Sequence, residues 1–221
     1  MNFETKYLIR WGIPGWVFLL MSFWPFVMFS KGVPITDPVK SISFIFSTAV
    51  IGVVIGYLIY QIYFAYDWLL GLSEREFINS DEQPLRPWGK WYNFNKRSAY
   101  RKFKAKQYYK LEFEWQNELS KITDENKRNY IATRFSHLLS TTHSLGALCW
   151  SLFISLFVNL FHLSYSITYV RTLLHTGSIA LNSILILLIL LPTISNQKYY
   201  SRNVNEFRMH FLNELKKQGA L

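Results

Sequence analysis

The sequence predicts an all-α membrane protein: four transmembrane helices that carry a helical cytoplasmic bundle, built from the 65–144 loop and the C-terminal tail. Charged residues make up only 17% of the chain, whereas a typical soluble domain carries about a quarter. The apolar stretches 11–30, 41–64, 145–161 and 176–197 contain no Asp, Glu, Lys or Arg. The segments between and after them contain apolar residues at helical spacing. This segregation of charge is typical of a chain that crosses a bilayer.

Each apolar stretch is long enough for one crossing. The first span, about 11–30, covers roughly 30 Å as a helix. The others are predicted over about 41–64, 145–163 and 175–195. Pro25 should kink or tilt the first span, and Pro192 marks a kink or the cytoplasmic end of the fourth.

Lysine and arginine predict the orientation. The N-terminal tail, the 65–144 loop and the C-terminal tail together carry 21 of them, whereas the connections 31–40 and 162–174 carry three. By the positive-inside rule, both termini and the long loop are cytoplasmic. We therefore expect a multi-pass protein of a bacterial inner membrane.

Four regions follow from this topology: 1–64 with the first two spans, the insert 65–144, 145–195 with the last two spans, and the C-terminal helix 196–221. The second span should continue as a helix to about Gly71. A break around Pro84 and Pro87 precedes a helix over about 95–121. Thr123 or Asp124 is the expected N-cap of the next helix, which can run unbroken into the third span.

The cytoplasmic helices have apolar seams. We expect the seams either to close a small bundle within the chain or to form a contact between subunits. The seam residues singled out are Tyr108, Leu111, Trp115, Leu119, Phe207 and Phe211.

Small and polar residues within the spans indicate helix packing. Thr48, Gly52 and Gly56 recur every four residues, and Ser151 and Ser155 form a weaker version of this pattern. Such a face either packs against another span of the same chain or mediates oligomerisation. Asn159 and Asn182 are expected to hydrogen-bond across helices, with a pore lining as the alternative.

The densest positive segment carries six cations between residues 96 and 106. We expect it to contact anionic lipid headgroups or a cytosolic protein partner, and direct nucleic-acid binding is disfavoured because the segment is tethered near the membrane. The candidate contact residues are Lys96, Arg97, Arg101, Lys102, Lys104 and Lys106.

No constellation in the sequence predicts an enzyme, a cofactor or a metal site. His137 and His143 are six residues apart and so fall on different helix faces, unlike the i, i+4 ladder of a helical metal site. Cys149 lies in an apolar helix without a basic neighbour in the sequence. The span centres contain no ionisable residue of the kind that coupled transport requires.

The span layout and the helical insert resemble the small four-span membrane subunits of bacterial anti-phage defence systems, such as the Kiwa membrane subunit or the membrane effectors associated with CRISPR and cyclic-nucleotide immunity. This resemblance implies an oligomeric membrane sensor or scaffold that contacts a cytosolic partner. The alternatives are an oligomeric pore-forming or membrane-disrupting effector, and a small transporter or lipid-modifying enzyme.

Overall fold

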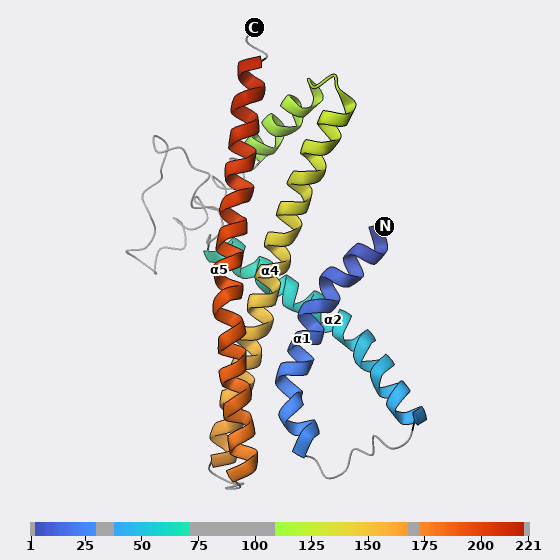
Figure 1. Ribbon diagram of the computed structural model, residues 1–221, viewed down its shortest axis with the longest axis vertical. Helices are drawn as coiled ribbons and strands as arrows, with labels where there is room; N and C mark the ends of the chain where they lie inside the picture. Colours follow the sequence, from blue (N-terminus) through green and yellow to red (C-terminus); the bar gives the residue numbers. More distant parts are fainter. Residues whose placement is uncertain (1–2, 30–37, 71–108, 168–172, 219–221) are drawn as a thin grey trace, which may run out of the picture. The chain divides into compact units, whose positions relative to one another are not determined.

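The structure is a computed structural model that describes residues 3–29, 38–70, 109–167 and 173–218. Within these ranges the regular structure is helical and there is no strand. The long helices are α1 (Phe3–Phe29), α2 (Pro38–Leu70), α4 (Glu125–Tyr165) and α5 (Leu173–Gln218), and a shorter helical segment covers 109–120. Figure 1 shows α4 and α5 as continuous helices.

The chain divides into two compact units. Unit 1 comprises Met1–Gly71 and Thr141–Tyr199, and unit 2 comprises Leu72–Ser140 and Tyr200–Leu221. Both α4 and α5 therefore begin in one unit and end in the other. The shorter 109–120 helix belongs to unit 2 alone.

Among the described residues, three helices are long and apolar enough to cross a membrane. The qualifying segments are Phe46–Tyr66 of α2, Glu125–Tyr165 of α4 and Thr176–Lys217 of α5. They correspond to the predicted second, third and fourth spans. The predicted first span forms a helix, α1, and is not among the three found in the described residues.

Local sequence signals explain where these helices begin and how far they run. Asp124 caps α4, because its Oδ1 accepts the backbone N–H groups of Asn126 at 2.9 Å and Lys127 at 3.2 Å. The helix that it starts runs unbroken into the predicted third span, as expected. α2 continues to Leu70, close to the predicted end at Gly71. α5 passes through Pro192 and continues to Gln218, so this proline does not end the helix.

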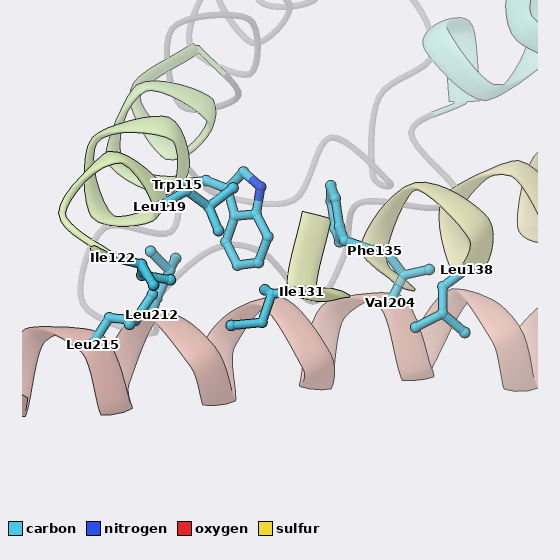
Figure 2. Close-up of a cluster of buried hydrophobic side chains, with 9 residues drawn as sticks. All are labelled: Trp115, Leu119, Ile122, Ile131, Phe135, Leu138, Val204, Leu212 and Leu215. Carbon is cyan, nitrogen blue, oxygen red and sulfur yellow. The ribbon is translucent and has the colours of Figure 1, made fainter. Parts of the chain in front are cut away.

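Unit 2 contains a compact apolar core to which three helical segments contribute (Figure 2). The Trp115 ring lies in the middle of the cluster and packs against Phe135, with ring centroids 4.9 Å apart. Both Trp115 and Ile131 are only 1% exposed. The cluster comprises Trp115, Leu119, Ile122, Ile131, Phe135, Leu138, Val204, Leu212 and Leu215.

The apolar core of unit 1 is smaller. Leu152 and Ile186 are fully buried and Leu190 nearly so, and side chains of α1 such as Val17 and Met21 pack against them. Other apolar side chains of the unit 1 helices point outward, among them Phe46 of α2 at 72% exposed and Phe157 of α4 at 70%. An outward apolar surface is what a helix bundle presents to lipid.

Candidate functional site

The crossing of α1 and α2 in unit 1 is built on glycine. A Cβ on Gly15 would overlap the carbonyl oxygen of Gly52, and a Cβ on Gly56 would overlap the carbonyl oxygen of Trp11. Trp16 covers Gly52, and its Nε1 donates to the carbonyl of Ala49 at 3.0 Å. The small-residue face of the second span thus packs against another helix of the same chain, the first of the two predicted alternatives.

A backbone carbonyl of α1 lies at the centre of a buried polar junction with α4 and α5. In an α-helix, the carbonyl of residue 21 accepts the N–H of residue 25, but Pro25 has no N–H. The amides of Asn159 and Asn182 supply the missing donors, because their Nδ2 atoms lie 2.9 and 2.7 Å from the Met21 oxygen. The proline therefore creates the acceptor that joins the three helices.

The two asparagines also hold each other. Asn182 donates from the same Nδ2 to the Oδ1 of Asn159 at 2.9 Å, and Asn159 donates to the Ser155 carbonyl at 2.8 Å. The side chains are 1% exposed at Asn159 and 7% at Asn182. Both amides thus donate within the chain, and they link α1, α4 and α5 by hydrogen bonds.

Serine side chains extend the buried junction between two of its three helices, α1 and α4. Ser22 donates to Ser155 at 3.2 Å, and Ser151 donates to the carbonyl of Pro14 at 2.6 Å. Ser22, Ser151 and Ser155 are at most 1% exposed. Every side chain in this polar line is uncharged, and the line provides hydrogen bonds between helices.

A second polar group joins α1, α2 and α4 at a different level of unit 1. Arg10 donates from Nη2 to the hydroxyl of Tyr60 and lies over the same ring, with Cζ 4.9 Å from the centroid. Tyr63 shares a hydrogen bond of 3.2 Å with Nδ1 of His143, and its ring fills the space where Gly146 lacks a side chain. The first third of α1, the second half of α2 and the middle of α4 thus meet here.

Unit 2 buries several charged and polar groups beside its apolar core. Arg208 is 3% exposed, lies 4.8 Å from the centroid of Phe135 and approaches Glu112 at 3.9 Å. Glu118 pairs with Lys121 at 2.7 Å, and Nδ2 of buried Asn205 has no hydrogen-bond partner among the described residues. At the surface, the hydrogen bond from Lys217 lowers the pKa of Glu214. The described side chains of unit 2 thus combine ion pairs with apolar contacts, whereas those of unit 1 include no Asp or Glu.

The predicted seam residues lie in or against the unit 2 core. Trp115 and Leu119 belong to it, and Leu111, Phe207 and Phe211 pack on it. Tyr108 and the basic residues of the 96–106 segment lie outside the described residues. Thr48, which was predicted to share the small-residue face of α2 with Gly52 and Gly56, is half-buried.

The two histidines considered above, His137 and His143, fall in different units. His137 is exposed in unit 2, whereas His143 belongs to unit 1. Among the described residues there is no group of three or more His, Cys, Asp or Glu side chains that could hold a metal ion.

Sequence reasoning singled out the two asparagines but missed their acceptor. A rule would have found it: the residue four positions before a helical proline has an unpaired carbonyl, and Met21 stands in that position to Pro25. The pairing of Arg10 with Tyr60 was also missed. Its only signal was a single arginine at the edge of an apolar stretch.

No protein-family model matches the chain, and no curated protein or solved structure is significantly similar to it.

Proposed function

We propose that the chain is a non-enzymatic, oligomeric inner-membrane protein, a sensor or scaffold subunit that couples an event in the membrane to a cytosolic protein partner. The observation that carries this proposal is the continuity of α4 and α5, which both run from unit 1 into unit 2. A hydrogen-bonded helix is stiff over such lengths. A change in helix packing within unit 1 therefore has a direct mechanical path into unit 2.

In the proposed topology α1 also crosses the membrane, so the number of crossings is four. Both termini and unit 2 are cytoplasmic. The charge asymmetry of 21 against three lysines and arginines supports this orientation. The group formed by Arg10, Tyr60, Tyr63 and His143 supports α1 as a crossing, because it brings the start of α1 level with the end of the apolar part of α2.

Association between copies would use the outward face of α2, since its glycine face is already covered by α1. Large apolar side chains stand on that outward face, with Phe46 72%, Val54 57% and Leu58 54% exposed. A role as a subunit of an anti-phage defence system is part of the proposal and rests on the resemblance in span layout.

The proposal is tested by purifying the tagged full chain in mild detergent and measuring its mass and its bound proteins. We expect an oligomer with a stoichiometric cytosolic partner. Trp115→Ala should release the partner, because it leaves a cavity in the unit 2 core and destabilises that unit. The oligomer should stay intact. Phe113→Ala is the matched control, since Phe113 is 73% exposed on the same helix. A monomer without a partner would overturn the proposal.

Reconstitution into dye-loaded vesicles separates a coupling protein from a pore. Because Asn159 and Asn182 are hydrogen-bonded within the chain, we expect the vesicles to stay sealed. Leakage that depends on protein density would favour a membrane-disrupting effector instead.

A further inference from the structure

Arg10 is a cation without a counter-charge among the described side chains of its unit. It donates to the Tyr60 hydroxyl, and its buried Nε has no hydrogen-bond acceptor within the described residues. The described side chains of unit 1, over 10–23, 46–66, 141–167 and 176–199, include no Asp or Glu. A partly desolvated guanidinium costs free energy unless an anion accompanies it.

On one side, Arg10 faces buried tyrosine side chains. Tyr60 and Tyr63 are 8% and 4% exposed, and their rings lie 6.2 Å apart. His143 secures Tyr63 from α4. Arg10 itself is only half-buried, so an anion can reach its guanidinium from outside the unit. A guanidinium held in place by a tyrosine ring and hydroxyl is preorganised to bind a planar or tetrahedral oxyanion.

The position of Arg10 in the sequence indicates which anion is available. It directly precedes the apolar stretch 11–30, and Tyr60 stands near the end of the apolar stretch 41–64. In a chain that crosses the bilayer with these stretches, both residues lie at the level of the headgroups. The anions concentrated at that level are phospholipid phosphates.

We infer that Arg10, held by Tyr60, binds the phosphate of an anionic phospholipid headgroup at the junction of α1 and α2. This inference rests on the proposed membrane crossing of α1. The bound lipid would neutralise the positive charge of Arg10. It would also make the packing of α1 against α2 sensitive to the lipid composition of the membrane, which adds a ligand to the proposed membrane sensing.

Native mass spectrometry of the full chain tests this site. The protein is released from nanodiscs of phosphatidylcholine with or without phosphatidylglycerol, and retained lipid is counted at rising collision energy. We expect the wild type to retain phosphatidylglycerol and Arg10→Gln to lose about tenfold in retention, the effect of one charge-assisted phosphate contact. Arg134→Gln, which removes an exposed cation from unit 2, is the matched control and should retain lipid as the wild type does.

Two further variants keep the result interpretable if Arg10→Gln folds poorly. Arg10→Lys preserves the charge without the fork of donors and should retain lipid at an intermediate level. Tyr60→Phe removes the hydroxyl that orients the guanidinium. Its loss of lipid retention should be several-fold smaller than the loss caused by Arg10→Gln.

A competition arm identifies the source of the phosphate. Inorganic phosphate at millimolar concentration should leave the retained lipid unchanged, and displacement by it would assign the site to a soluble anion. Equal retention by the wild type and Arg10→Gln, or an equal loss in Arg134→Gln, would overturn the inference. Partner binding measured on the same Arg10→Gln sample distinguishes a failed lipid site from a failure of the proposed function.

Discussion

In unit 1, Asn159 and Asn182 hold α1 through one backbone carbonyl, and glycines let α1 approach α2 closely. In unit 2, the helices instead surround Trp115, Ile131 and their apolar neighbours. In lipid, the burial of apolar groups provides little driving force between helices, so close backbone contact and interhelical hydrogen bonds must hold them. In water, apolar burial is the dominant favourable term. Each unit therefore has the kind of core that suits its proposed surroundings.

The difference has a consequence for coupling. A junction of few hydrogen bonds can rearrange with a modest change in free energy, whereas a packed apolar core resists partial opening. α4 and α5 connect the two. We expect unit 1 to be the part that responds and unit 2 the part that presents a stable surface.

The largest expected effect is in the unit 2 core. Trp115→Ala should destabilise unit 2 by about 3–5 kcal/mol, because it removes a buried indole and leaves a cavity. Phe113→Ala, at a 73% exposed site of the same helix, should change stability by less than about 0.5 kcal/mol. Amide hydrogen exchange of the full chain in nanodiscs measures both. Similar values for the two variants would mean that Trp115 does not organise this core.

A smaller effect is expected at the glycine crossing of unit 1. Gly56→Ala places a Cβ against the backbone of Trp11, so α1 and α2 must move apart, at a cost of about 1–3 kcal/mol. Gly177→Ala is the matched control in α5, where a Cβ would meet nothing within 4 Å, and should stabilise the helix by about 0.5–1 kcal/mol. Unfolding in mixed detergent, followed by tryptophan fluorescence, gives both numbers. A stable Gly56→Ala variant would show that the crossing is not tight.

Asn182 in unit 1 and Asn205 in unit 2 provide the most direct test of the comparison between the two units. Both lie on α5, and each is 7% exposed. Asn182→Leu removes the hydrogen bonds to Met21 and Asn159 and should cost about 0.6–1.7 kcal/mol, the range measured for hydrogen bonds between membrane helices. Asn205→Leu removes an amide whose Nδ2 has no hydrogen-bond partner in the described part of the chain, so it should be neutral or stabilising. The same unfolding assay applies, and a reversed order would contradict the assignment of polar packing to unit 1.

The smallest effect is expected at the surface of unit 2. Lys216 pairs with Glu114 at 3.1 Å, with the two side chains 52% and 34% exposed. Lys216→Met should therefore cost between about 0 and 1 kcal/mol. Most of that cost should disappear in 1 M salt, where the screening length falls to about 3 Å. A cost that persists in high salt would indicate that the lysine contributes through packing of its aliphatic chain.

Local patterns in the sequence were enough to predict the helical class, the long run of α4 from its cap into an apolar span, and the extension of α2 to its end near Gly71. These features depend on residues within one or two turns of each other: a capping carboxylate at Asp124, helical spacing, and an apolar run without charge. The same patterns also selected Asn159 and Asn182 as residues that bond across helices. The fourth crossing remains a prediction for α1.

The tertiary structure alone decided which surfaces meet. Nothing local to Gly52 and Gly56 specifies that they receive α1 rather than a second copy, and nothing local to Met21 specifies that two asparagines more than 130 residues away complete its hydrogen bonds. Each helix in lipid satisfies nearly all of its own backbone, so its sequence constrains its partners only weakly. Which helices pack together is therefore determined by a few small residues, by one carbonyl that a proline leaves without its helical donor, and by the side chains that reach this carbonyl.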